Sequence, residues 1–265
     1  MRISLIDDYE HLDEDVEYII ENILQENDNS GDFKKLEEEF YCILANSCDC
    51  IECKNEKCSH GGSYEIKNNK LLLKEARGCD DLIYECNENC FCSRSHSMCL
   101  NKLVQFGPHE GLEIKKFHDK GYGLITKEFI PKGTFICEYA GEVLTKNEAF
   151  KRDQLNQASN KMNYIFCLNE ISMTSKDEKI QTFIDPSRKG NIGRYINHSC
   201  DANCEIISVR VDSIIPKISI FAKRDICAQQ EITFSYGDVD ANNKTKMCLC
   251  GANICKIYLP NISFS

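Results

Sequence analysis

The sequence contains no long apolar run and no excess of basic residues. No stretch approaches the ~18–20 apolar residues of a membrane-spanning helix, and residues 1–10 lack the apolar region of a secretory signal. We therefore expect an intracellular protein with no membrane partner. The 32 Lys and Arg are outnumbered by 42 Asp and Glu, which argues against direct sequence-specific DNA binding through a basic face.

Two further absences narrow the fold class. No internal repeat is evident, and no predicted strand leads into the glycine-rich turn and helix that bind dinucleotides, because Gly121 and Gly123 follow a loop.

Cysteine, in contrast, is abundant, with 18 in 265 residues, and 42% of the residues are hydrophobic and can form a core. In a reducing compartment, cysteines this dense are metal ligands more often than disulfides.

Acidic residues are concentrated in the first part of the chain. Residues 1–40 hold fourteen Asp and Glu against three Lys and Arg, a net charge of −11, whereas the whole chain carries −10. Apolar residues recur at helical spacing from Leu12 to Leu24 and from Phe33 to Leu44, which predicts two amphipathic helices in residues 1–45. Amphipathicity is compatible with a brace on the main domain or with a partner-binding arm.

The remaining chain divides into three parts. Residues 46–106 carry nine cysteines and few large apolar residues, so metal must hold them together. Residues 107–237 alternate short β-rich runs with turns, and residues 145–162 predict one helix and a loop inserted among the strands. Residues 238–265 form a cysteine-containing tail. The strands are expected at 123–126, 134–139, 164–168, 204–211, 217–221 and 231–234.

The cysteines of residues 46–106 are spaced as metal ligands. Nine thiolates fill three tetrahedral zinc sites when six bind one metal each and three bridge two metals. The predicted ligands are Cys48, Cys50, Cys53, Cys58, Cys79, Cys86, Cys90, Cys92 and Cys99. Cys79 stands apart from the others, and its place as the ninth ligand stays open. His60 and His96 are alternative ligands, although an exposed loop histidine is the commoner case.

A second set combines Cys200 with the tail residues Cys248, Cys250 and Cys255. Four thiolates make one closed tetrahedral zinc site, which would tie the segment around Asn197 to the tail. Three of the cysteines left over lie in or beside predicted strands and are interpreted as small core residues. These are Cys137, Cys167 and Cys227.

Four short motifs follow one another along the chain. They are KGYG at 120–123, CEYAGE at 137–142, GNIGRYINHSC at 190–200 and EITFSY at 231–236. In this order they resemble the SET-domain protein lysine methyltransferases. The cysteine-rich flanks resemble the pre-SET and post-SET zinc segments of the suppressor-of-variegation class within that family.

The resemblance implies a fold and its cofactors. The fold is mainly β, a SET fold of small curved sheets with a knot-like C-terminal core. Residues 46–106 would be the pre-SET segment with three zinc ions, 107–237 the SET catalytic domain and 238–265 the post-SET segment with one zinc ion, preceded by the N-terminal helices. The implied methyl donor is S-adenosylmethionine.

The resemblance also implies which residues contact this cofactor. They are Lys120, Gly121, Tyr122, Gly123, Tyr164, Arg194, Asn197, His198 and Leu249. Tyr122 stands where the family usually has tryptophan, a residue that this sequence lacks entirely. Asn197 and His198 resemble the pair that binds the adenine and amino-acid ends of the cofactor.

Tyr236, Tyr139 and Phe234 match the catalytic positions of the family. The resemblance implies that the two tyrosines orient the target lysine amine, which has a pKa near ~10.4 in model peptides and must lose a proton before it attacks. Phenylalanine at position 234 implies room for more than one methyl group. Glu138 and Glu142 could instead form an acid–base pair, but their neighbours match a SET strand and turn.

By resemblance the substrate is a lysine of the histone H3 tail, with the ninth position favoured and the thirty-sixth possible. This implies a location in the nucleus, on the chromosome, with chromatin as the partner. Two alternatives remain open at this point: a lysine methyltransferase for a non-histone protein, and a catalytically weak, zinc-based chromatin interaction module. The presence of both Tyr236 and His198 argues against the module.

Overall fold

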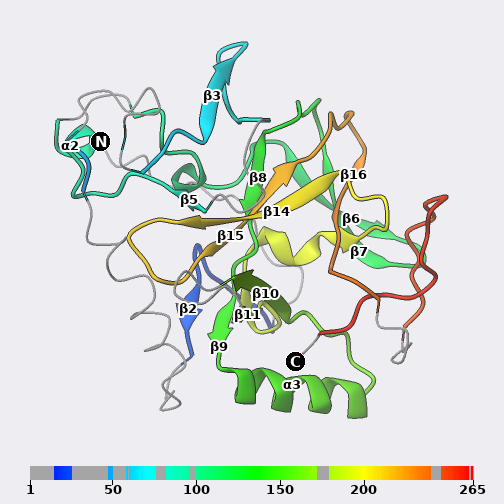
Figure 1. The fold of residues 1–265 in the computed structure, drawn as a ribbon. Helices are drawn as coiled ribbons and strands as arrows, with labels where there is room; N and C mark the ends of the chain where they lie inside the picture. The colour runs from blue at the N-terminus through cyan, green and yellow to red at the C-terminus, as the bar shows by residue number, and fades with distance from the viewer. Residues whose placement is uncertain are drawn as a thin grey trace.

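The computed structural model describes residues 15–25, 47–49, 58, 60–75, 82–95, 99–171, 179–239, 246–262 and 264. Within these ranges the chain is mainly β, with three four-stranded sheets and two isolated strand pairs (Figure 1). The predicted fold class is therefore confirmed. In this described part, no helix has both the length and the apolar character needed to span a membrane.

The three larger sheets combine strands from distant parts of the sequence. The first has the order β5 (Ile83–Tyr84), β14 (Cys204–Arg210), β15 (Lys217–Ala222) and β8 (Phe135–Glu138). The second has β10 (Phe166–Ile171), β11 (Lys179–Asp185), β9 (Glu142–Leu144) and β2 (Ile23–Leu24). The third has β13 (Asn197–His198), β16 (Glu231–Phe234), β7 (Gly121–Thr126) and β6 (Leu112–Phe117).

Smaller elements complete the fold. The strand pairs are β1 (Glu17–Tyr18) with β12 (Lys189–Gly190), and β3 (Tyr64–Lys67) with β4 (Lys70–Leu73). Short helical turns are α2 (Phe91–Arg94), η1 (Val104–Phe106) and η2 (Ile192–Tyr195). All six predicted strands in 107–237 are present, with their ends shifted by at most three residues.

The first sheet packs against apolar clusters on both of its faces. Ile136 and Ile220 face the main core, together with Leu124 of β7. Phe135 and Phe221 face a second apolar cluster, and their rings lie 5.4 Å apart. Tyr139, which follows β8, and Phe234, at the end of β16 in the third sheet, both pack in the main core, so neither can move without disturbing that core.

Helix α3 (Lys146–Ala158) is the predicted insertion among the strands and lies at one edge of the molecule (Figure 1). The hydroxyl of Thr145 caps it by accepting the N–H of Glu148 at 3.3 Å. The helix has few apolar residues, and ion pairs fasten it to the second sheet. Arg152 lies 2.8 Å from both Glu142 and Asp185.

A buried ion pair joins the first and second sheets. The guanidinium of Arg210, at the end of β14, donates to both carboxylate oxygens of Glu170 on β10, at 2.9 and 2.7 Å. Both side chains are almost completely shielded from solvent. The two-pronged geometry fixes the position of β10 relative to β14.

The first predicted N-terminal helix is wrong in the residues that the structure describes. Residues 15–25 form no helix but two short strands, of which β1 pairs with β12 and β2 pairs with β9, both in parallel. The backbone N–H groups of Ile23 and Gln25 donate to the carbonyls of Gly141 and Val143, each at 3.1 Å. Pairing with an open sheet edge thus outweighs the helical spacing of the apolar residues. The second predicted helix, from Phe33 to Leu44, lies outside the described residues, and the four-part domain division stays a prediction.

Candidate active site and metal centres

An aromatic cluster lies where β8, β10 and β16 come together. The rings of Tyr139 and Phe166 lie 5.8 and 5.9 Å from the ring of Phe234, which in turn is 4.9 Å from Tyr236. Tyr139 and Phe234 are buried, and Tyr236 is partly exposed. The three predicted catalytic residues are therefore brought together, with Phe166 as a fourth wall.

Both tyrosine hydroxyls of this cluster donate to backbone carbonyls. Tyr236 donates to the oxygen of Ile196 at 2.8 Å, and Tyr139 to the oxygen of Tyr164 at 2.6 Å. Burial, followed by the neighbouring tyrosines, raises the pKa of both phenols above the usual range. Both hydroxyls are therefore protonated at neutral pH. They can orient a polar group by hydrogen bonding, but they do not act as phenolate bases.

His198 connects this cluster to the cysteines of the tail. Its Nδ1 accepts the backbone N–H of Tyr236 at 3.1 Å, and its Nε2 lies 3.4 Å from Sγ of Cys200. Burial, followed by the charge of Lys256, lowers the pKa of His198 to about 4. The imidazole is thus neutral at pH 7, and the acceptor role of Nδ1 places the proton on Nε2.

The predicted cofactor loop lies against Asn197. The amide Nδ2 of Asn197 donates to the carbonyl of Tyr122 at 3.1 Å and to Glu231 at 2.9 Å, and Lys120 forms an ion pair with the same carboxylate. A side chain on Gly123 would place a Cβ only 2.7 Å from Nδ2 of Asn197. Glycine is therefore required at 123 for this close approach, whereas Gly121 has a positive φ of 75°.

Arg194 lies between two aromatic rings beside this loop. Its guanidinium carbon is 4.7 Å from the ring centre of Tyr164 and 4.9 Å from that of Tyr195. Tyr195 also meets Tyr122 edge to face at 6.3 Å, and Tyr122 remains 42% exposed. An exposed aromatic face next to a fixed loop is available for stacking by a ligand.

The structure assembles the predicted metal set of the tail. The sulfurs of Cys200, Cys248, Cys250 and Cys255 all lie within 4.8 Å of one another. Sγ of Cys200 is 3.9 Å from Sγ of Cys248, close to the ~3.8 Å edge of a tetrahedron with ~2.3 Å Zn–S bonds. Two backbone N–H groups, those of Lys256 and Ile257, point at Cys200 and Cys255 at 3.3 and 3.4 Å. The donor set fits one zinc ion.

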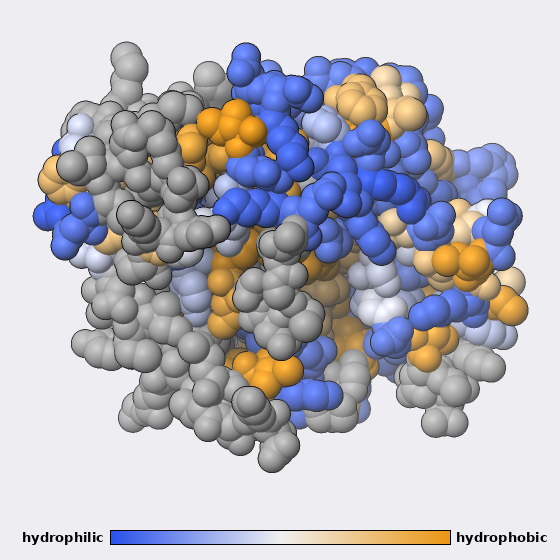
Figure 2. Space-filling view, turned by 45° about the horizontal axis from the view of Figure 1, so that its top comes forward, coloured by the Kyte–Doolittle hydropathy of each residue, from blue (hydrophilic) through white to orange (hydrophobic). Residues whose placement is uncertain are grey.

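The tail around these cysteines exposes apolar side chains. Leu249 is 51% exposed, and Met247, Ile254 and Ile257 are more exposed still. Figure 2 shows apolar patches at the right-hand side of the visible face, on the side where the tail lies in Figure 1. The predicted contact residue Leu249 is thus placed on a surface that a ligand could cover.

The cysteines of residues 46–106 also cluster in the described part of the chain. Cys48, Cys58, Cys86, Cys90 and Cys92 are buried together, with Cys99 against them. Two overlapping groups have donor atoms within 4.8 Å of one another. They are Cys48, Cys58, His60 and Cys86, and Cys86, Cys92 and Cys99. This density of buried thiols fits a multinuclear metal cluster.

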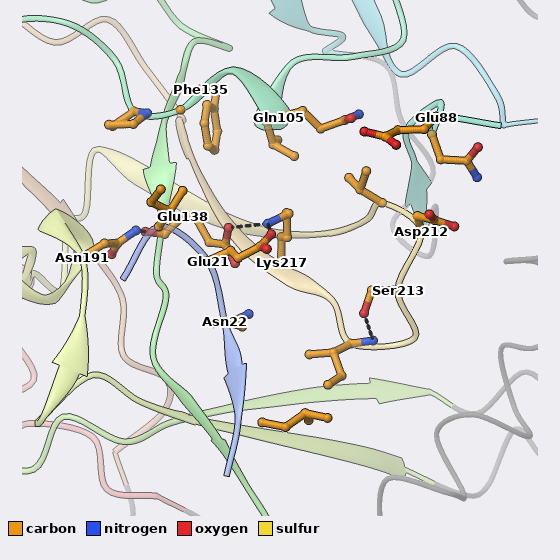
Figure 3. Close-up of a pocket in the computed structure, with 18 of the residues that line it drawn as sticks. Glu21, Asn22, Glu88, Gln105, Phe135, Glu138, Asn191, Asp212, Ser213 and Lys217 are labelled. Atoms are coloured by element: carbon orange, nitrogen blue, oxygen red, sulfur yellow. Dashed lines mark hydrogen bonds and ion pairs between the residues drawn. The ribbon is translucent and has the colours of Figure 1, made fainter. Parts of the chain in front are cut away.

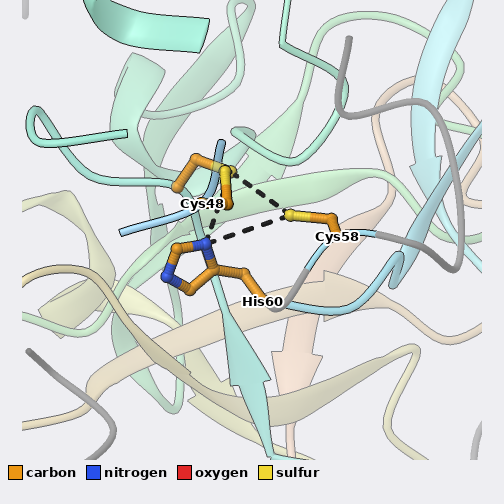
Figure 4. Close-up of side chains that lie close together, drawn as sticks. Cys48, Cys58 and His60 are labelled. Carbon is orange, nitrogen blue, oxygen red and sulfur yellow. Dashed lines mark hydrogen bonds between the residues drawn. The ribbon is translucent and has the colours of Figure 1, made fainter. Parts of the chain in front are cut away.

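His60 differs from the expectation of an exposed loop histidine, because it is buried and lies within the first group (Figure 4). The other alternative ligand, His96, lies outside the described residues, as do Cys50, Cys53 and Cys79. Among the cysteines interpreted as core residues, Cys137 is buried, Cys167 is partly buried and Cys227 is exposed. The interpretation is wrong for Cys227, which follows a strand-like run but faces solvent.

A cavity of about 590 Å³ lies elsewhere, between the N-terminal segment and the first sheet (Figure 3). Lys217 reaches the buried carboxylate of Glu138 at 2.8 Å there, and burial raises the pKa of Glu138 in spite of this pairing. Glu142 pairs separately with Arg152. The two glutamates are thus occupied by different cations and form no acid–base pair. None of the predicted site residues that the structure describes lines this cavity.

Two functional candidates were missed by the sequence interpretation. Phe166 forms part of the aromatic cluster, and Glu231 holds both Lys120 and Asn197. Phe166 stands two positions after Tyr164 in a predicted strand. Because side chains alternate between the faces of a strand, the sequence signal that could have identified Phe166 is its place on the same face as Tyr164. Glu231 is the first residue of the EITFSY motif, but nothing in the sequence reveals its partners.

The matching family model and the similar proteins point to the same family. Residues 121–237 match the family model of the SET domain. The histone-lysine N-methyltransferase SETMAR of Bos taurus is 37% identical, over 82% of this chain and 71% of that protein. SETMAR of Homo sapiens is 38% identical over 82% of this chain, but this covers 32% of that longer protein. The probable histone-lysine N-methyltransferase set-23 of Caenorhabditis briggsae is 36% identical over 89% of this chain and 91% of that protein.

Solved structures show the same relationship. The methyltransferase domain of human SETMAR has a TM-score of 0.73 and 34% identity, covering 92% of this chain and 89% of that chain. SUVH6 of Arabidopsis thaliana, solved with SAM, gives 0.69 and 28%, covering 92% and 50%. KRYPTONITE, solved with DNA, a histone H3 peptide and SAH, gives 0.65 and 26%, covering 92% and 48%. With its fold, its ordered motifs and these relatives, the chain belongs to the SET-domain family of histone-lysine N-methyltransferases.

Proposed function

We propose that this protein transfers methyl groups from S-adenosylmethionine to a lysine of the histone H3 tail, with the ninth position favoured and the thirty-sixth possible. The observation that carries the proposal is the aromatic cluster with two protonated tyrosine hydroxyls, in which His198 holds the backbone of Tyr236. Related proteins solved with SAM, or with SAH and an H3 peptide, support the choice of donor and substrate.

The aromatic residues would receive the end of the target lysine. Tyr139, Phe166 and Phe234 offer apolar and π surfaces, which favour a cationic methylated amine close to their faces. Tyr236 and Tyr139 would orient the amine lone pair after its proton has left to water. S-adenosylmethionine, when bound, supplies the activated methyl group. The contribution of the chain is position and a preformed polar environment.

The donor would lie over the loop of Lys120 to Gly123. Tyr122 offers an exposed ring for stacking, and Gly121 and Gly123 let the backbone approach closely. Asn197, His198, Arg194 and Tyr164 would hold its polar ends, and Leu249 of the tail would cover it. Glu231 is a positioning residue here, because it fixes Lys120 and Asn197 rather than reaching the donor itself.

We also propose four bound zinc ions, three in the cluster of residues 48–99 and one at Cys200, Cys248, Cys250 and Cys255. The tail site is structural in its chemistry, since four thiolates leave no open position. Its effect would be functional, because Cys200 contacts His198, and a metal at this site would hold the tail cysteines next to that histidine. We place the protein on chromatin in the nucleus, as the activity of its relatives suggests.

The decisive experiment is mass spectrometry of H3 peptides after incubation with the protein and S-adenosylmethionine. Peptides in which the ninth or the thirty-sixth lysine is replaced by arginine identify the position, and the Tyr236→Phe protein is the inactive control. Methylation of other nuclear proteins but of no H3 peptide would favour a non-histone substrate. No transfer to any protein by a fully zinc-loaded sample would favour an interaction module.

A further inference from the structure

His60 is held inside the cysteine cluster by a tight turn. The N–H of Gly61 donates to the carbonyl of Cys58 at 2.8 Å, and Gly61 has a φ of 80°, which a residue without a side chain adopts freely. This turn brings Cys58 and His60 to the same side of the chain. The imidazole is only 7% exposed, although histidine carries two polar nitrogens that require partners.

Sulfur atoms surround one nitrogen of this ring. Nδ1 of His60 lies 3.7 Å from Sγ of Cys86, 3.8 Å from Cys90 and 4.0 Å from Cys58. A single N–H can serve one good acceptor, so three sulfurs around one nitrogen are not explained by hydrogen bonding. Figure 4 shows the imidazole and the sulfurs of Cys48 and Cys58 facing one another.

The distances match the edges of a coordination tetrahedron. Bond lengths of ~2.3 Å to sulfur and ~2.05 Å to nitrogen give S···S edges of about 3.8 Å and N···S edges of about 3.6 Å. The observed S···S distances are 3.7 Å between Cys48 and Cys86 and 3.9 Å between Cys58 and Cys86. Within the group of Cys48, Cys58, His60 and Cys86, the N···S distances of 3.7 Å to Cys86 and 4.0 Å to Cys58 exceed the ideal edge slightly, and the sulfur of Cys48 lies within 4.8 Å of the ring nitrogen. A bound metal would close these gaps.

We propose that His60 is a metal ligand of this cluster through Nδ1, completing a three-sulfur, one-nitrogen zinc centre with Cys48, Cys58 and Cys86. The inference rests on the proposed zinc cluster and identifies a donor that the cysteine pattern does not contain. An imidazole nitrogen has one lone pair and cannot bridge two metals, so His60 is a terminal ligand. Cys86 belongs to both groups of donors and is therefore a bridging thiolate.

The proposal changes the composition of the cluster. Twelve metal–ligand bonds from nine donors require three bridging sulfurs, and with His60 as one donor eight thiolates suffice. Cys50 and Cys53 are tethered close to Cys48 in the sequence, whereas Cys79 follows the β3–β4 hairpin. We assign Cys79 as the cysteine that the cluster does not need. A neutral imidazole in place of a thiolate also makes the cluster less negative by one charge.

The test measures zinc content and a direct metal–nitrogen bond in the full-length protein. Elemental analysis is done on the native protein and on His60→Ala, His60→Cys and Cys79→Ser. The native protein, the cysteine variant and Cys79→Ser should each retain four zinc ions, and His60→Ala should lose at least one. In cadmium-113-substituted, nitrogen-15-labelled protein, Nδ1 of His60 should show a cadmium–nitrogen coupling that is absent from His60→Cys.

The outcomes separate this inference from the zinc proposal. A native protein with zinc in the tail site alone would refute the cluster itself. Four zinc ions in both the native protein and His60→Ala, without a cadmium–nitrogen coupling, would refute the role of His60 and leave the cluster intact. Zinc loss in Cys79→Ser would overturn the assignment of Cys79. If His60→Ala fails to fold, the coupling and the cysteine variant still decide the question.

Discussion

The Nδ1 atom of His198 accepts the backbone N–H of Tyr236 at 3.1 Å, and the two rings lie 5.3 Å apart. The opposite nitrogen of the same imidazole lies 3.4 Å from Sγ of Cys200. One contact chain therefore runs from a proposed zinc ligand, through the histidine, to the proposed catalytic tyrosine. His198 fixes the backbone from which the tyrosine hydroxyl is presented, in addition to any contact with the donor.

These contacts predict different effects for substitutions of Tyr236 and His198. Tyr236→Phe should lower the rate of transfer by about 10²-fold or more, with binding of S-adenosylmethionine nearly unchanged, because only a hydroxyl that faces the amine is lost. His198→Ala should weaken both binding and transfer, since it also leaves the Tyr236 N–H without its acceptor, a cost of about 1–3 kcal/mol. Calorimetry and single-turnover assays measure the two effects. Equal loss of donor affinity in both variants would contradict this division.

Removing one ligand from the tail should abolish activity without unfolding the protein. Cys250→Ser should lower the zinc content by one and stop methyl transfer, because the tail no longer holds its place beside His198 and the donor loop. The zinc ions of residues 48–99 and the far-ultraviolet circular dichroism should persist. Cys227→Ser is the matched control, since this cysteine is exposed and belongs to neither metal group. Full activity with one zinc ion missing would refute the role of the tail site.

The identity of residue 234 should set the number of methyl groups. Phe234 is buried among Tyr139, Phe166 and Tyr236, so a hydroxyl added there would occupy space next to the amine. We expect the native protein to proceed beyond monomethyl-lysine and Phe234→Tyr to favour the monomethyl product. One added hydroxyl is a modest change in volume, so the first transfer should persist. Time courses by mass spectrometry distinguish the products, and more trimethyl-lysine from the tyrosine variant would sink the prediction.

The buried pair of Arg210 and Glu170 should matter for stability. Glu170→Ala leaves a guanidinium buried without its partner, and such a break typically costs about 3–5 kcal/mol of unfolding free energy. Arg224→Ala removes a comparable pair with Asp201 at 2.8 Å that is exposed to solvent, and should cost about 0–1 kcal/mol. Urea denaturation of both variants provides the comparison. Similar losses in the two proteins would show that β10 is not held to β14 in this way.

The strands of residues 107–237 were predictable because their residues carry a local signal. Runs such as those of β8 and β15 are rich in β-branched and aromatic residues between turns, and no other element competes for them. Residues 15–25 show the limit of such reasoning. Their apolar spacing indicates a helix, but the open edges of β9 and β12 are created by residues more than a hundred positions away, which no local window contains.

Part of the geometry of the candidate site was predictable. Motif order located Tyr139, Phe234, Tyr236 and His198, which lie together in the structure, and their roles in catalysis and cofactor binding stay predictions. The hydrogen-bond partners of the site residues were not predictable. The contact of His198 with Cys200 and the hydrogen bond from Asn197 to Glu231 depend on how β13 lies beside β16. The sequence could not decide whether His60 is a metal ligand, for a related reason. Burial distinguishes a ligand from an ordinary loop histidine, and burial is a property of the folded chain.

The edge strands that come from outside residues 121–237 have a consequence for inheritance. Ile83 of β5 is completely buried beside Val209, and β2 pairs with β9, so strands from the first hundred residues complete two of the three large sheets. The stretch that matches the SET family model therefore lacks strands that belong to these sheets. A protein made from this stretch alone would have unpaired edge strands in two sheets. Their free backbone N–H and C=O groups could then pair with other chains. We therefore expect a transferable form of the domain to include the flanking segments that supply β2 and β5.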